Sequence, residues 1–354
     1  MNNRIEALRS SFKDEFDGYL VRSPVNMLYF AGVSGGAMLT VTNDGMATLY
    51  VYGVNYEQIK ADAQNCTVKR AKHWKDFTAK LQKQFKEQKL KNLAFDTMNF
   101  EENRKLQKVF NASLSLEPKS EYVWNLRRIK DDDELKKMRV AAELTVKGME
   151  VAQEKMIAGL REFEVAAEIE YGMRVHGSQG VAFETIVASG PHSAYPHGGC
   201  GDRRMKTGDV VVVDIGATYQ HYRSDMTRTF VIGKPSEKQE RTYGIVKEAQ
   251  QDAFMDMKNG ANAKDIDARA RETIKKAGYG ESFVHGLGHG IGLEVHEQPL
   301  LNSRSKDTLK TRNVVTDEPG IYIVGFGGFR AEDTVLISQS KAERLTDGHY
   351  NLKL

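Results

Sequence analysis

The sequence of 354 residues has few cysteines, which cross-link small secreted proteins, and no long apolar stretch that could span a membrane. Its two cysteines, Cys66 and Cys200, lie far apart in the chain, so we expect no disulfide framework. No stretch approaches the roughly 18 apolar residues that a membrane-spanning helix needs. Residues 1–16 are charged and lack the apolar segment of a signal peptide. Together these absences predict a cytoplasmic protein with no membrane partner.

Several common functional signals are missing as well. The net charge of +3 is spread along the chain, and no basic run carries interleaved aromatic residues, which argues against a nucleic-acid partner. There is no His-Glu-x-x-His zinc motif and no Gly-x-Ser-x-Gly nucleophile turn. The cysteines do not have the spacing of a metal site. The sequence therefore lacks these three familiar signatures of a zinc site, a serine nucleophile and a cysteine metal site.

The length suits two domains. The first third alternates helical and strand-like patterns, which predicts an α/β domain over residues 1–122. Two strands at 37–42 and 46–51 are joined by Asn43-Asp44-Gly45, a strong hairpin signal. A short apolar run at 18–21 predicts a further strand. Helices are expected over four ranges: 2–16, 55–63, 74–88 and 99–110.

A second domain is expected over residues 123–354, after a change in composition near Glu117–Ser120. A long helix should run to about residue 158, with Asp131 and the next two aspartates capping its start. The pattern of two helices followed by strands then occurs twice, which suggests a structural repeat. The expected helices are 161–175, 236–258 and 264–277. Strand-like runs lie near 183–189, 209–217, 228–233, 313–324 and 333–338.

Charged residues stand at the ends of predicted core strands in this second domain. Asp214 directly follows four valines, and Asp225 precedes the next strand. Burying two carboxylates side by side is costly unless a cation compensates them. The alternative is a pair of turn or capping aspartates, and this pair alone leaves both interpretations open.

Histidines and further acids follow the same pattern. His285, His289 and His296 lie in a glycine-rich stretch, and the apolar residues between them favour a half-buried strand over a surface loop. Glu318 and Glu332 stand at the edges of two more apolar runs. A single glutamate in such a place is usually a solvated strand end. Four acids and one histidine suit two divalent cations such as Mn²⁺, Co²⁺ or Zn²⁺, because carboxylates can bridge two ions.

These segments resemble the pita-bread, creatinase-like metallopeptidases, in particular the branch of Xaa-Pro dipeptidases (prolidases) and Xaa-Pro aminopeptidases. The matching strings are DIGA, SDMTRTF, GHGIGLEVHE, EPGIY, RAEDTVL and SGPHSAYPHG. The resemblance covers nearly the whole chain. It implies a creatinase-type α/β domain followed by a pita-bread catalytic domain, a curved sheet with helices outside and a pseudo-twofold repeat. It also implies a homodimer that acts on proline-containing peptides.

The resemblance assigns roles by position. The implied metal ligands are Asp214, Asp225, His289, Glu318 and Glu332. The implied catalytic residues are Glu318 as the proton carrier, His296 as a donor to the developing oxyanion and His197 facing the substrate. His285 and Arg330 would hold the substrate or the metal ligands in position.

Two departures from the family pattern bear on function. Gly53–Tyr56 replaces the Asp-x-Arg-Tyr motif of the first domain, and Leu300 stands where family dipeptidases often have an arginine for the substrate carboxylate. Arg304 lies nearby but out of register. We therefore expect an Xaa-Pro aminopeptidase-like enzyme, with a strict Xaa-Pro dipeptidase as the alternative.

Three remoter alternatives use related folds. A binding protein that has lost catalysis would be expected to lack one or more of the five ligands, and creatinase lacks this ligand set. Methionine aminopeptidase shares the ligands but usually lacks the first domain. Cys200, three residues after His197, is expected to be an incidental thiol, and a redox-sensitive edge of the pocket is the second interpretation.

Overall fold

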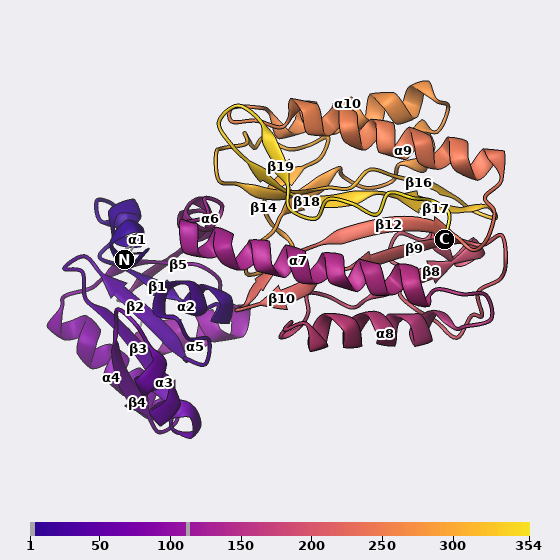
Figure 1. Cartoon of the computed structure of the whole chain (residues 1–354). Helices are drawn as coiled ribbons and strands as arrows, with labels where there is room; N and C mark the ends of the chain where they lie inside the picture. The colour runs from indigo at the N-terminus through magenta and orange to yellow at the C-terminus, as the bar shows by residue number, and fades with distance from the viewer. Residues whose placement is uncertain (1–3, 111–113) are drawn as a thin grey trace. The chain divides into compact units, whose positions relative to one another are not determined.

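The computed structural model describes residues 4–110 and 114–354. Contacts within the chain divide it into two compact units, residues 1–127 and 128–354, each described by itself below. The first runs from indigo to magenta and the second from magenta to yellow in Figure 1. Residues 2 and 3 of the expected first helix lie outside the described part.

The first unit contains a six-stranded mixed sheet in the order β4-β3-β2-β1-β5-β6. The strands β2 and β3 form the predicted antiparallel hairpin, and Gly45 takes a φ of +83° at its turn. The α/β expectation is confirmed. The strands are β1 (Gly18–Val21), β2 (Met38–Thr42), β3 (Ala47–Tyr52), β4 (Thr67–Ala71), β5 (Asn92–Phe95) and β6 (Ser115–Pro118).

Most helices of the first unit follow the predicted ranges. Two were not predicted, α2 (Pro24–Ala31) and α6 (Ser120–Arg127). Helix α2 begins with a Ser23 cap and proline at its first position, and ends at Gly32, whose φ is +72°. The others are α1 (Arg4–Phe12), α3 (Tyr56–Asp62), α4 (Trp74–Glu87) and α5 (Phe100–Phe110), with a 3₁₀ turn, η1, at Gly53–Asn55.

The second unit contains the predicted pairs of helices. Asp131 and Glu134 form a capping box at the start of the long helix α7, and Ser236 and Gln239 form another at α9. No helix of the described residues is long and apolar enough to cross a membrane. The helices are α7 (Asp132–Lys155), α8 (Glu162–Val175), α9 (Glu237–Asp256) and α10 (Ala263–Lys276), with 3₁₀ turns η2 (Gly190–Ala194) and η3 (Gly280–Ser282).

An eight-stranded sheet forms the centre of this unit, in the order β14-β13-β15-β18-β12-β9-β8, with β19 also paired to β18. Its strands are β8 (Ile186–Ser189), β9 (Val210–Ile215), β12 (Met226–Val231), β13 (Gly288–Gly290), β14 (Glu297–Leu301), β15 (Val314–Asp317), β18 (Glu332–Ile337) and β19 (Ala342–Arg344). Short strands make two smaller sheets: β7 (Gly180–Val181), β10 (Ala217–Tyr219) and β11 (Tyr222–Arg223) in one, β16 (Gly320–Ile323) and β17 (Gly327–Arg330) in the other.

Each helix pair covers its own part of the large sheet (Figure 1). Side chains of α9 and α10 pack with Val315 and Val335, from β15 and β18. Side chains of α7 and α8 pack with Val211, Val213 and Phe230, from β9 and β12. The doubled order of two helices and then strands is confirmed, and the middle strands β9, β12, β15 and β18 come from both halves.

Candidate active site

The acids predicted at strand ends meet where the two halves of the sheet join. The backbone pairing sets Thr227 of β12 opposite both Asp214 of β9 and Glu332 of β18. Asp225 directly precedes β12, and Glu318 directly follows β15. Antiparallel registry therefore brings carboxylates that are more than 100 positions apart in sequence to one place.

His289 reaches the same place from β13. Glycines flank it because neighbouring backbone lies close: a Cβ on Gly288 would lie 2.2 Å from the Thr316 oxygen, and one on Gly290 would lie 2.3 Å from the Gln298 oxygen. The glycines thus make room for the backbone of the neighbouring strands. The Nδ1 of His289 lies 3.0 Å from the Gly290 carbonyl, which can only accept, so Nδ1 carries the proton. The lone pair of Nε2 is then available.

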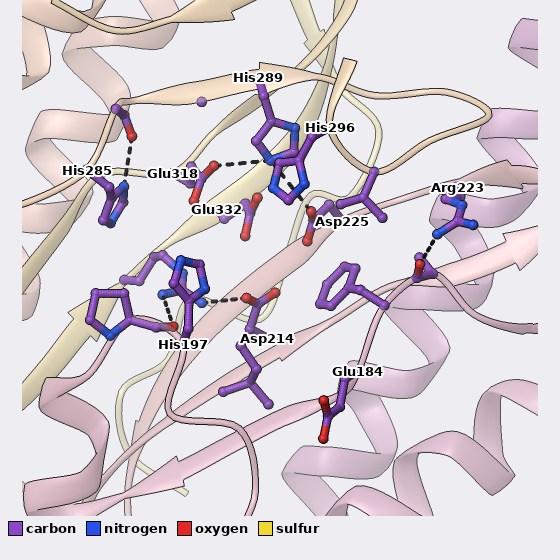
Figure 2. A pocket seen from close by; sticks show the side chains of 18 of the residues that line it. Glu184, His197, Asp214, Arg223, Asp225, His285, His289, His296, Glu318 and Glu332 are labelled. Atoms are coloured by element: carbon purple, nitrogen blue, oxygen red, sulfur yellow. Dashed lines mark hydrogen bonds and ion pairs between the residues drawn. The ribbon is translucent and has the colours of Figure 1, made fainter. Parts of the chain in front are cut away.

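All nine predicted site residues line one cavity of about 650 Å³. Figure 2 shows the acids and His289 in its centre, His285 and His197 toward one end, and Glu184 and Arg223 toward the other. A second hollow of about 710 Å³ shares His285 and two further lining residues with it. The prediction that these nine residues gather at one site agrees with this geometry.

The central side chains fit a divalent cation. Ligand atoms of Asp225, His289 and Glu332 all lie within 4.8 Å of one another, and all three residues are buried. The Nε2 of His289 lies 3.3 Å from Glu318 Oε1 and 4.0 Å from Asp225 Oδ2. Within the described chain, the buried Oδ1 atoms of Asp225 and Asp214 have no hydrogen-bond partner. Buried acceptors without donors are costly, and a bound cation would satisfy them.

The pKa values of the metal-free site also indicate that a cation binds there. Burial, followed by the nearby Glu332 and Asp214, raises the pKa of Asp225 well above its ordinary value. Burial and Asp214 raise the pKa of Glu318 to about 8. Burial and the neighbouring His296 lower the pKa of His289 to about 4. Without a cation, the raised pKa values of Asp225 and Glu318 favour their protonated forms and the lowered pKa of His289 favours a neutral imidazole, and a bound metal would displace the protons of the acids.

Arg330 orients two of the acids, Asp214 and Glu332, through hydrogen bonds. Its Nη2 donates to Asp214 Oδ2 at 2.5 Å, and its Nε donates to Thr227 Oγ1 at 2.9 Å. Thr227 in turn donates to Glu332 Oε2 at 2.6 Å. The buried guanidinium therefore orients Asp214 directly and Glu332 through one hydroxyl group.

Tyr322 links this network to the end of the cavity where His285 lies. Its hydroxyl accepts from Arg330 Nη1 at 2.8 Å and lies 2.9 Å from His285 Nε2. Burial, then Arg330, lowers the pKa of His285 to about 4, so this imidazole is neutral. His197 and His296 are exposed residues that line the same cavity.

Two functional contacts were missed at the sequence level. Tyr322 lies in the string EPGIY and Thr227 in SDMTRTF, but nothing in the linear pattern marks either as a bridge to Arg330. Cys200 is half-buried, and burial followed by Glu184 raises its pKa. A raised pKa disfavours the reactive thiolate, which supports the interpretation as an incidental thiol.

Comparison with known proteins identifies the family. The model of metallopeptidase family M24 matches residues 136–339, and that of the creatinase/prolidase N-terminal domain matches residues 4–129. The Xaa-Pro dipeptidase of Pyrococcus furiosus is 42% identical over 98% of both chains. This chain belongs to metallopeptidase family M24. It is a metallo-exopeptidase, and the family implies divalent metal ions at the site.

Solved structures of the family agree with the fold. The prolidase from Pyrococcus horikoshii has a TM-score of 0.94 at 38% identity, covering 99% of this chain and 100% of that one. The X-Pro aminopeptidase from Thermotoga maritima has a TM-score of 0.91 at 34% identity, covering 99% of both chains. The predicted fold, a creatinase-type domain followed by a pita-bread domain, is confirmed.

Proposed function

We propose that this M24 enzyme is an Xaa-Pro dipeptidase, which hydrolyses the bond between a first residue and a C-terminal proline. The observation that carries the proposal is the full-length similarity to two Pyrococcus proteins named Xaa-Pro dipeptidase, 42% and 39% identical over 97–98% of their lengths. This similarity favours the strict Xaa-Pro dipeptidase, which the sequence left as the alternative, over the Xaa-Pro aminopeptidase-like enzyme that it favoured.

The geometry supplies a physical reason for that preference. The prediction of an aminopeptidase rests on Leu300, which stands where family dipeptidases often have an arginine that binds the substrate's C-terminal carboxylate. Leu300 lines the second hollow, and so do Arg304 and Lys306, for which no side-chain ion pair is found among the described residues. The free carboxylate of a C-terminal proline could therefore bind Arg304 or Lys306, a few residues after Leu300 in the chain.

We propose that two divalent ions, Mn²⁺, Co²⁺ or Zn²⁺, complete the centre. Asp225, His289 and Glu332 form a compact group for one ion, and the carboxylates of Asp214 and Glu318 would complete a second position. When bound, the ions would supply Lewis acidity toward the attacking water and the scissile carbonyl. A homodimer stays a prediction.

The chain's own residues move and hold the protons. Glu318 lines the cavity with its Oε1 atom 3.3 Å from His289 Nε2, so its carboxyl group would take a proton from the attacking water and pass it on. The leaving prolyl nitrogen has no N–H and needs such a proton. Partial burial and then His197 lower the pKa of His296, whose neutral imidazole N–H would donate to the oxyanion. His197 would orient the carbonyl, while His285 and Arg330 hold their neighbours in place.

The decisive test compares two substrates of different length. A charge-assisted hydrogen bond to the terminal carboxylate is worth about 1.5–3 kcal/mol, or roughly ten- to a hundred-fold in discrimination. We expect kcat/KM for Ala-Pro to exceed that for Ala-Pro-Ala by at least about ten-fold. Arg304→Ala should remove most of this difference, while Lys310→Ala, a cation outside the lining of both hollows, should preserve it.

Equal turnover of both peptides would return the enzyme to the aminopeptidases, and no turnover of either would reject proline specificity. The metal centre is tested separately. Glu332→Ala should abolish activity and lower the metal content of a protein that remains folded. Wild-type activity with a full metal complement in that variant would contradict the assignment.

A further inference from the structure

An ion pair buried beside the active site has no part in the chemistry described so far. Lys130 Nζ lies 3.2 Å from Glu297 Oε2, and each side chain is only 1% exposed. Charges so deeply buried depend on each other, because removing one leaves the other without compensation. Lys130 directly precedes Asp131, the cap of helix α7, and Glu297 directly follows His296.

The Glu297 carboxylate fills the inside of the loop that joins β13 to β14. Its Oε1 accepts from the Glu294 backbone N–H at 3.1 Å. A Cβ added at Gly292 would lie only 2.9 Å from Oε2, so the loop backbone lies directly against the carboxylate. The shape of residues 291–296 is therefore set around this one charged group.

The two histidines of this hairpin are held differently. His289 is held largely by groups outside the ion pair, because its backbone N–H donates to Thr316 Oγ1 at 3.0 Å and its Nδ1 donates to the Gly290 carbonyl; the Val295 backbone of the loop also lies beside its ring. The ring of His296 has no hydrogen bond or ion pair among the described residues, and it packs 4.3 Å from the His289 ring. The placement of His296 therefore depends on the backbone of its neighbour, Glu297.

Both backbone polar groups of Lys130 are hydrogen-bonded to Arg312. Its N–H donates to the Arg312 carbonyl at 3.0 Å, and its own carbonyl accepts from Arg312 Nε at 2.6 Å. The side chain of Asn313 holds the carbonyl of Arg128 at 2.8 Å. The backbone that carries Lys130 is therefore held in place. Its buried ammonium group contacts the β13–β14 loop through Glu297 and is not a mobile surface charge.

We propose that Lys130 is a positioning residue for peptide hydrolysis, which acts through Glu297 to aim His296 at the substrate carbonyl. This rests on the proposed role of His296 in the Xaa-Pro dipeptidase reaction. Displacing a reacting group by about 1 Å can cost about a hundred-fold in rate. Because His296 acts on the oxyanion, the loss falls on kcat more than on KM.

The first experiment removes the charge while keeping the length of the side chain. Lys130→Met should lower kcat for Ala-Pro by about a hundred-fold with KM little changed and the metal content retained. Lys147→Met is the matched control, since Lys147 pairs with Glu150 on the surface of the same helix, α7, where both side chains are nearly half exposed. The control should keep wild-type kinetics, and wild-type kcat in Lys130→Met would overturn the proposal.

A double-mutant cycle then separates positioning from general damage. Added to His296→Ala, Lys130→Met should cost little further kcat, because the group through which it acts is already gone. Losses that multiply in full would show that Lys130 does not act through His296.

The Lys130→Met/Glu297→Gln pair leaves no lone buried charge. It should regain stability toward urea, yet remain slow, because the fixed ammonium–carboxylate geometry is lost. Recovery of kcat together with stability would reduce the ion pair to a structural role. If Lys130→Met alone does not fold, this double variant and Glu297→Gln carry the same test. A wild-type enzyme inactive on Ala-Pro would instead refute the proposed function, and the cycle would then be run on whichever peptide it cleaves.

Discussion

Asp317 and Glu318 are neighbours in the chain with opposite surroundings. Glu318 faces the cavity, whereas Asp317 is 0% exposed and neither carboxylate oxygen has a hydrogen-bond partner among the described residues. Burial, opposed by Arg344 and assisted by Asp333, raises the pKa of Asp317 well above its ordinary value. A neutral but unsatisfied carboxyl group in a core strand is a cost to folding.

We therefore expect Asp317→Val to stabilise the protein by about 1–3 kcal/mol, the usual penalty of one unsatisfied buried polar group. Valine suits the strand β15, where Val314 and Val315 already pack. The measurement is urea unfolding of the metal-free protein.

Asp333, paired with Asp317 across β15 and β18, is the matched control. It bonds Arg228 at 2.8 Å and Gln250 at 2.9 Å, so Asp333→Val should destabilise by about 3–5 kcal/mol. Destabilisation by both substitutions would show that Asp317 has a partner in solution.

The central acids make the stability of the metal-free protein depend on pH. The pKa of Glu318 is raised to about 8 in the fold, so its contribution is present at low pH and is lost as pH rises toward 8. The pKa values of His285 and His289 are lowered to about 4, so their contribution is complete above pH 6.5 and lost as pH falls. Of these three groups, only Glu318 changes its contribution between pH 6.5 and 8.

We expect the melting temperature of the metal-free protein to fall across pH 6.5–8, and expect saturating Mn²⁺ to remove or reverse that fall. Calorimetry of chelated and reloaded protein checks this. A Glu318→Gln variant, neutral at every pH, should show a flatter metal-free profile. A melting temperature that rises equally with and without metal would contradict the protonation states described here.

At the scale of elements, the regular pieces could be predicted from sequence and the connections between them could not. Helix α7 carries its own start signal in Asp131 and Glu134, and the hairpin β2–β3 carries Asn43–Gly45. In the strand-like range 313–324, Glu318 ends one apolar run before a Pro-Gly turn, but nothing in the sequence predicts that the two parts, β15 and β16, belong to different sheets. That division leaves Glu318 at the turn, facing the cavity.

The candidate site shows the same limit. Single residues at strand ends, such as Asp214 and Glu332, were found because charge beside a core strand is unusual. Tyr322 and Thr227 were missed because their roles arise only when β12, β16 and β17 bring Arg330 between them. Lys130 was missed for a similar reason, since its partner is 167 positions away. Local signals predict elements, whereas contacts between distant segments need the fold.

Capping gives an element-scale prediction. The Asp131 carboxylate accepts from the Glu134 N–H at 2.9 Å, and Glu134 returns a bond to the Asp131 N–H at 2.9 Å. Asp131→Ala should lower the free energy of unfolding by about 0.5–2 kcal/mol, the usual value of an N-cap. Asp133→Ala, which changes an exposed acid of the same turn, should cost much less. Equal losses would mean that charge near the helix start, rather than the cap, is what stabilises α7.

At the scale of the molecule, the division into two units has a thermodynamic consequence. All five proposed metal ligands lie in residues 128–354, and none lies in residues 1–127. A ligand stabilises only the cooperative unit that binds it, by RT ln(1 + [L]/Kd), which is about 2.7 kcal/mol at a hundred-fold excess over Kd. For a unit of this size that corresponds to roughly 5–10 °C in melting temperature.

We therefore expect calorimetry to resolve two transitions, of which Mn²⁺ raises only one. Each can be assigned by a cavity substitution: Leu81→Ala, in the core of the first unit, should lower the metal-independent transition. Ile274→Ala, from α10 in the second unit, should lower the metal-dependent one. A single transition that moves with metal and with both substitutions would show that the two units unfold together. In that case the first unit would be stabilised by metal bound entirely outside it.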